Sequence, residues 1–106
     1  MIDKKLFLKN LSKDTLKYSI RVSNSFKKDL KKFLKDDKII FSMNEVITKL
    51  AKGERLDNKY RDHDLKGNFK GFRECHITPD VLLIYEIRKN ELILILARIG
   101  SHSDLF

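Results

Sequence analysis

The sequence predicts one α+β domain in which a helical hairpin packs on a twisted, antiparallel-rich sheet, in the order β-α-α-β-β-β. Three observations support this prediction. The 106 residues suffice for one domain. Apolar residues recur at helical spacing between residues 26 and 50, and three short strand-like segments follow residue 71, the last two of which are rich in Val, Leu and Ile. We assign residues 18–106 to the domain and residues 1–17 to an N-terminal extension.

The first half of the domain contains one strand and two helices. Residues 18–22 alternate apolar and polar side chains, as a half-buried strand does. Three successive residues, Ser23, Asn24 and Ser25, offer N-caps for a helix that ends at Asp36 and Asp37. The next helix ends near Gly53, and a capping box at Ser42 would allow a later start. Its apolar face consists of Ile39, Ile40, Met43, Val46, Ile47 and Leu50.

The second half contains a long connection and three strands. Residues 54–71 have no apolar periodicity, and irregular segments of this length in small domains are commonly functional. Strands are predicted over residues 72–77, 81–87 and 91–98, with turns at 78–80 and 89–90. Residues 1–17 contain a short apolar patch that is compatible with a frayed extension, a short helix or an arm on the domain.

Charge and cysteine content narrow the classes of function. The chain has 23 Lys and Arg against 15 Asp and Glu, a net charge of +8 that favours polyanions such as nucleic acid. A single cysteine, Cys75, excludes an intramolecular disulfide and a zinc site built from several cysteines. Because no leader-like segment and no run of about 20 apolar residues occurs, we expect a cytoplasmic protein without a membrane partner.

The three histidines, His63, His76 and His102, all lie in the C-terminal half. Alternation along residues 72–77 places Glu74 and His76 on one face of the sheet and Cys75 on the face toward the helices. The same alternation in the last strand predicts that Arg98 shares a face with Leu94 and Leu96. Asp80 follows in the turn after His76.

These residue types suit cleavage of RNA. The reaction needs a base for the 2′-hydroxyl, an acid for the departing 5′-oxygen and a cation for the phosphorane. Histidine, with an unperturbed pKa of about 6.5, serves either proton-transfer role, and arginine binds phosphoryl oxygens. Each residue alone also has a structural interpretation, since Asp80 is a typical turn residue and Phe106 a chain end.

Longer motifs make the assignment specific. Residues 60–67 read Y-R-D-H-D-L-K-G, residues 69–77 F-K-G-F-R-E-C-H-I, residues 79–85 P-D-V-L-L-I-Y and residues 98–106 R-I-G-S-H-S-D-L-F. Over residues 18–106 the chain resembles the YafQ branch of the RelE toxin superfamily. Residues 1–17 precede the usual start of that family. The resemblance implies a microbial-RNase-like fold and an mRNA interferase, an endoribonuclease that cleaves messenger RNA, in the best-known members on the ribosome.

The resemblance also implies a set of site residues. The catalytic positions it implies are His63, His76, Asp80, His102 and Phe106. The substrate-binding positions are Arg98, Glu74, Lys70 and Arg73. We expect His76 and His102 to transfer protons, Asp80 or His63 to tune or replace one of them, and Phe106 to stack on a base. No cofactor or metal is expected, because the 2′-hydroxyl is an internal nucleophile.

The partners implied by the resemblance are an acidic antitoxin of the RelB or DinJ kind, mRNA and the ribosome, and operator DNA contacted mainly through the antitoxin. Two alternatives remain open at this point. The chain is compatible with an inactive RNA- or antitoxin-binding module of the same fold. It is also compatible with a metal-dependent hydrolase, although the histidine spacing matches no compact ligand motif.

Overall fold

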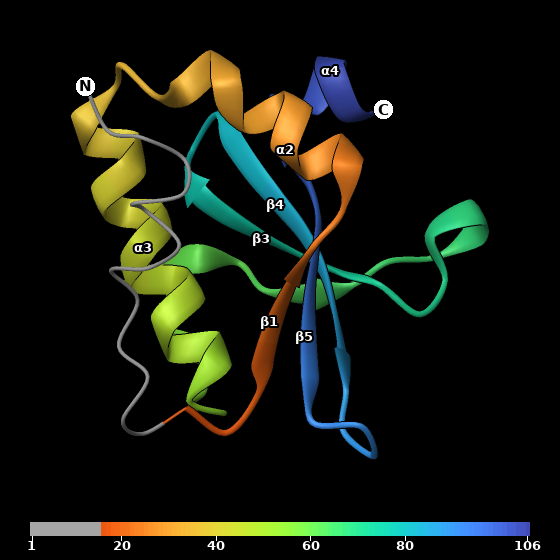
Figure 1. Ribbon diagram of the computed structural model, residues 1–106. Coiled ribbons are helices and arrows are strands. Elements are labelled where there is room, and N and C mark those ends of the chain that lie inside the picture. Colours follow the sequence, from red (N-terminus) through yellow and green to blue (C-terminus); the bar gives the residue numbers. More distant parts are fainter. Residues whose placement is uncertain (1–15) are drawn as a thin grey trace.

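The computed structural model describes residues 16–106. The predicted extension therefore lies outside the described part of the chain, apart from Leu16 and Lys17. The strands are β1 (Ser19–Val22), β2 (His63–Asp64), β3 (Arg73–Thr78), β4 (Val81–Arg88) and β5 (Ile93–Gly100) (Figure 1). The helices are α2 (Asn24–Leu30), α3 (Asp37–Ala51) and α4 (His102–Leu105), with 3-10 turns η1 (Lys31–Phe33), η2 (Asn58–Tyr60) and η3 (Gly67–Phe69). This arrangement confirms the predicted α+β class.

The strands form one mixed sheet in the order β1-β5-β4-β3-β2. β1 runs parallel to β5, and the other neighbouring pairs are antiparallel. The short edge strand β2 was not predicted, because its two residues are polar and exposed and carry no strand periodicity. It interrupts the predicted connection and pairs His63 with Glu74. No helix within residues 16–106 has the length and apolar character needed to cross a membrane.

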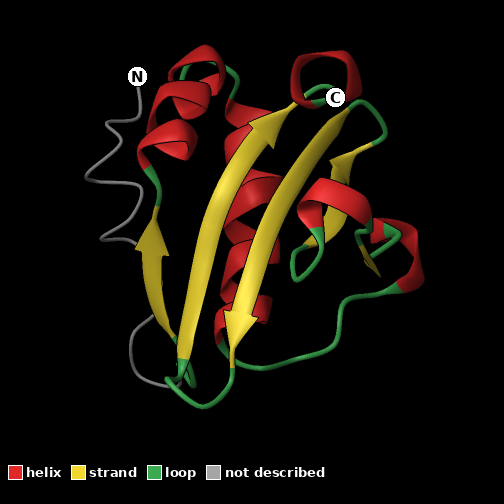
Figure 2. Cartoon of the chain, turned by 90° about the vertical axis from the view of Figure 1, so that its right-hand side faces the viewer, coloured by secondary structure: helices red, strands yellow, loops and turns green. Residues whose placement is uncertain are grey.

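Two apolar clusters cover opposite faces of the sheet. The larger one lies between the sheet and the helices α2 and α3, which contact mainly β5 and β3 respectively. Cys75 is fully buried there, as the alternation predicted. The smaller cluster lies on the other face, nearest the viewer in Figure 2, where α4 and the η3 segment cover only part of the sheet. Its members are Leu82, Ile84 and Leu105, with Leu65, Phe69, Phe72 and Ala97 packed against them.

The helix α2 shields the part of β5 that β1 does not reach. Ser23, one of the three candidate caps, caps the helix by accepting a hydrogen bond from the Phe26 amide at 3.0 Å, and its hydroxyl donates to the Ala97 carbonyl at 2.7 Å. Farther along, a carboxylate oxygen of Asp29 accepts from the Ile99 amide at 3.1 Å. Polar groups of α2 therefore satisfy backbone groups that would otherwise form an open strand edge.

A β-bulge moves Arg98 to the face opposite the one predicted for it. The pairing of β4 with β5 shifts between Ile84 and Tyr85, so that Tyr85 pairs with Leu96 but Ile84 pairs with Arg98. Paired residues share a face of the sheet, and Ile84 belongs to the smaller cluster. The prediction that Arg98 shares a face with Leu94 and Leu96 was therefore wrong, because strict alternation does not hold across a bulge.

We predict that Ser23→Ala lowers the free energy of unfolding by about 1–2 kcal/mol, because it removes an N-cap and a bond to β5 together. Urea denaturation followed by circular dichroism measures this change. Ser25→Ala, at an exposed position of the same helix, is the matched control and should change stability by less than about 0.5 kcal/mol. Equal effects of the two substitutions would contradict the role assigned to Ser23.

Candidate active site

A carboxylate and two histidines meet where β2 joins β3. Glu74 is 6% exposed, and its Oε1 lies 3.3 Å from Nε2 of His63 and 3.6 Å from Nε2 of His76. His63 is paired with Glu74 across the strands, and His76 follows two positions later on the same face. The strands thus place two of the predicted catalytic residues around one buried acidic group.

The ring of His63 has a polar neighbour at each nitrogen. Its Nδ1 lies 3.1 Å from the backbone oxygen of Asp64, while its Nε2 faces the Glu74 carboxylate. The two contacts hold the His63 ring between the Asp64 backbone and the Glu74 side chain.

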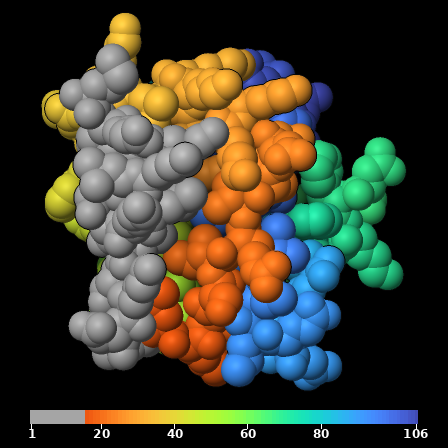
Figure 3. Space-filling view, in the orientation of Figure 1, coloured from red at the N-terminus to blue at the C-terminus, as the bar shows by residue number. Residues whose placement is uncertain are grey.

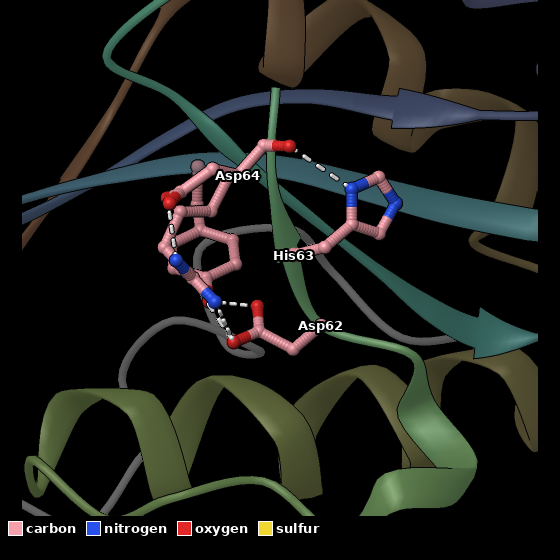
Figure 4. A network of polar contacts seen from close by, with 5 residues as sticks. Asp62, His63 and Asp64 are labelled. Carbon is pink, nitrogen blue, oxygen red and sulfur yellow. Dashed lines mark hydrogen bonds and ion pairs between the residues drawn. The ribbon is translucent and has the colours of Figure 1, made fainter. Parts of the chain in front are cut away.

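Arg73 fixes the two residues that flank His63 (Figure 4). Its guanidinium donates to Asp62 at 2.7 Å and to Asp64, and the buried Tyr85 hydroxyl donates to the other oxygen of Asp62. The bond to Asp62 raises the pKa of Arg73 above its usual value. We call Arg73, Asp62, Asp64 and Tyr85 the β2 clamp. The predicted substrate-binding residue Arg73 is thus engaged by carboxylates on both sides of His63.

A second group of site residues lies at the C-terminal end of the sheet. The helix α4 begins at His102 and is followed by Phe106, and the ring centroids of these two residues lie 5.0 Å apart. The Phe106 ring also contacts the ring of Phe69 in η3 edge-on, with 5.3 Å between the centroids. Gly100 permits this arrangement, because a Cβ there would lie 3.2 Å from Leu105. The sequence did not single out Phe69, although it stands in one of the quoted motifs. Its aromatic contact with Phe106 places it beside the predicted site residues.

The two groups lie on one face of the sheet. His76 pairs with Leu82, which pairs with Gly100, two residues before His102. Since neighbouring strands lie about 4.8 Å apart, the backbones of His76 and Gly100 are separated by about 10 Å. Leu82 forms the floor between them, and Phe69 of η3 packs against the cluster that contains Leu82. The segment around η3 projects from the right-hand side of the molecule in Figure 3.

The remaining predicted residues are placed as follows. Asp80 is exposed in the turn between β3 and β4, close to His76 in sequence, and Lys70 is exposed directly after η3. Within residues 16–106 neither forms an ion pair. Arg98 instead donates to Asp29 at 2.7 Å, and that hydrogen bond raises its pKa. In the described part of the chain no group of three His, Cys, Asp or Glu side chains is arranged to hold a metal ion.

Comparison with known proteins identifies the family. A model of the bacterial YafQ toxins of type II toxin–antitoxin systems matches residues 18–106. The chain belongs to this family. The mRNA interferase toxin YafQ of Escherichia coli K12 is 34% identical over 88 residues, which cover 82% of this chain and 94% of that protein.

Solved structures of family members have the same fold. The crystal structure of a metal-bound toxin from Helicobacter pylori is 47% identical, with a TM-score of 0.77, and the match covers 84% of this chain and 99% of that one. YafQ in the E. coli DinJ–YafQ complex is 33% identical, with a TM-score of 0.74 and coverage of 84% and 98%. These likenesses confirm the fold inferred from the family resemblance.

We predict that Arg73→Gln releases β2 and lowers the free energy of unfolding by about 1–3 kcal/mol, because charge-assisted hydrogen bonds to two carboxylates are lost. The histidine ring resonances in an NMR spectrum report on the site itself. His63 should shift toward the position of an exposed histidine, while His102, held by other elements, should not move. Arg88→Gln, which breaks an exposed ion pair with Glu86, is the control. An unchanged His63 resonance would exclude the proposed role of the clamp.

The clamp also predicts a loss of stability in alkali. Burial and the hydrogen bond to Asp62 raise the pKa of Tyr85 well above its ordinary value of 10.0. Above pH 10 the unfolded chain loses this proton while the folded chain keeps it, so stability falls as pH rises. Tyr85 should account for about 1.4 kcal/mol by pH 11. The difference in unfolding free energy between wild type and Tyr85→Phe, measured from pH 8 to 11, should shrink accordingly. A constant difference would contradict the prediction.

Proposed function

We propose that this toxin is an endoribonuclease that cleaves mRNA by attack of the 2′-hydroxyl on the adjacent phosphorus, with residues of the exposed sheet face transferring the protons. The observation that supports it most is the cluster of His63, Glu74 and His76 on the same face as His102 and Phe106. Membership of a family whose E. coli relative is named an mRNA interferase gives the substrate class.

The proposed reaction needs no external nucleophile, because the 2′-hydroxyl of the RNA itself attacks the phosphorus. The new bond joins the 2′-oxygen to phosphorus and the bond to the 5′-oxygen breaks, giving a 2′,3′-cyclic phosphate and a free 5′-hydroxyl. One group takes the 2′ proton and another supplies a proton to the 5′-oxygen. We assign these transfers to His76 and His102, which lie on opposite sides of the floor formed by Leu82.

The other site residues have supporting roles in this proposal. The carboxyl group of Glu74 is buried beside both imidazoles, so it suits orientation of the two histidines better than contact with phosphate. His63 donates a hydrogen bond to the phosphorane and stabilises the charge that develops there. Phe106 and Phe69 offer an aromatic platform on which a base of the message stacks. Asp80, in the turn that follows β3, tunes proton transfer by His76.

The net charge and the family membership support a proposal about where cleavage takes place and which partner binds the toxin. A net charge of +8 suits binding to ribosomal RNA, and we propose that cleavage takes place on translating ribosomes. The E. coli relative has been crystallised with DinJ, and we propose that this toxin likewise binds an acidic antitoxin. We further propose that the complex contacts operator DNA mainly through the antitoxin.

The test is cleavage of a reporter mRNA by purified toxin, with and without translating ribosomes. We expect His76→Ala and His102→Ala each to lower the rate by about 10²–10⁴-fold, the usual contribution of a positioned acid or base. Wild type should produce 2′,3′-cyclic phosphate ends in the presence of EDTA. Lys89→Ala, in the exposed turn between β4 and β5, is the control and should cleave as wild type does.

Two outcomes would overturn the proposal. If wild type cleaves no mRNA with ribosomes present yet still binds its antitoxin, the chain is a binding module of the same fold. If His76→Ala and His102→Ala cleave at the rate of Lys89→Ala, the proton-transfer residues lie elsewhere. Circular dichroism of each variant distinguishes a lost catalytic group from a lost fold.

A further inference from the structure

The proposed reaction needs a cation that is free to bind phosphate, and two arginines near the site are already engaged. Arg73 donates to Asp62 and Asp64, and Arg98 donates to Asp29 through Nε and Nη2. A phosphate that recruited either guanidinium would have to compete with a carboxylate that binds it in the same geometry.

A groove beside His76 contains cations without such partners. It encloses about 550 Å³ between α3, η2 and the end of β3. Its lining consists of Ser42, Glu45, Lys59, Tyr60, Arg61, His76, Ile77, Thr78 and Pro79. Within residues 16–106, Lys59 and Arg61 form no ion pair. The ammonium of Lys59 lies 5.1 Å from the centre of the Tyr60 ring.

Arg61 and His76 line the same groove. Arg61 is the residue at which η2 ends, two positions before β2, and η2 is in contact with β3. β2 pairs with β3 through His63 and Glu74, so the segment that leads into β2 runs beside the end of β3 that carries His76.

The backbone at Arg61 is held in a conformation that favours other residues. Its φ of 49° lies in the left-handed region, where glycine and asparagine are at ease and a long side chain is uncommon. Non-glycine residues in such conformations concentrate at functional sites, where the side chain has a use that offsets the strain. The tight turn from η2 into β2 explains the backbone conformation, but it does not explain an arginine there.

We propose that this groove binds a phosphodiester of the mRNA beside the scissile bond, with Arg61 as the main phosphate ligand and Lys59 as the second cation. The assignment rests on the proposed ribonuclease function and extends it to the path of the substrate. Arginine presents a planar fork of N–H donors that matches two phosphoryl oxygens. The carboxylate of Glu45, at the groove wall on α3, restricts where a second phosphate can lie.

The backbone conformation allows a test that separates function from folding. Arg61→Asn removes the charge but suits the left-handed region, so its melting temperature should equal or exceed that of wild type. Arg61→Lys keeps the charge without the fork. Arg21→Asn, at an exposed position of β1 on the opposite edge of the sheet, is the matched control.

The probe is a short single-stranded 2′-O-methyl RNA, which the proposed reaction cannot cleave, and binding is followed by fluorescence anisotropy at several salt concentrations. We expect Arg61→Asn to weaken binding roughly tenfold. We expect the slope of log K against log salt to fall by about 0.7, the value for one phosphate contact on a single strand. Arg61→Lys should restore the salt slope but only part of the affinity. Arg21→Asn should bind as wild type does.

Cleavage of the reporter mRNA by the same proteins distinguishes this inference from the proposed function. If wild type cleaves mRNA and Arg61→Asn binds the probe as Arg21→Asn does, the groove assignment is wrong and the ribonuclease stands. If wild type cleaves nothing but Arg61→Asn alone loses binding, the groove assignment stands and the ribonuclease fails.

Discussion

The bonds between Arg73 and the carboxylates on either side of His63 are the interaction on which the site depends. A two-residue edge strand forms too few ladder hydrogen bonds to hold a position by itself. Arg73 supplies the missing constraint from β3, and Tyr85 extends it to β4 through Asp62. His63 therefore stands between two fixed neighbours, with its ring directed at Glu74.

The cationic side chains of the chain fall into two groups, one that is ion-paired within the fold and one that is exposed near the site. Some cationic side chains form ion pairs that stabilise the fold, such as Arg98, whose partner Asp29 also covers the edge of β5. Others, such as Arg61 and Lys70, remain exposed near the site face. The net charge of the sequence predicts attraction to polyanions. It does not distinguish ion-paired cations from free ones, because ion pairs such as Arg98 with Asp29 join residues far apart in the sequence.

Regular elements made the fold and part of the site predictable. Glu74 and His76 were placed correctly because β3 alternates without interruption through them. Arg98 was misplaced because a bulge has no signature in apolar periodicity. The edge strand and Phe69 were missed because both lie in a segment whose conformation is set by tertiary contacts rather than by local pattern. The C-terminal residues entered through the family motif, since no spacing rule connects His102 to the strands.

The parallel pairing of β1 with β5 has a consequence for how the chain becomes active. Ser19 pairs with Ile93 and Val22 with Leu96. During synthesis β1 therefore has no partner strand until β5 has been made. The helix α2 packs on β5, so it also lacks its packing partner until β5 has been made. A chain still emerging from the ribosome thus lacks β5, the strand that joins β1 to β4, and contacts between segments so far apart in sequence form late. The nascent toxin remains unassembled for most of its own synthesis.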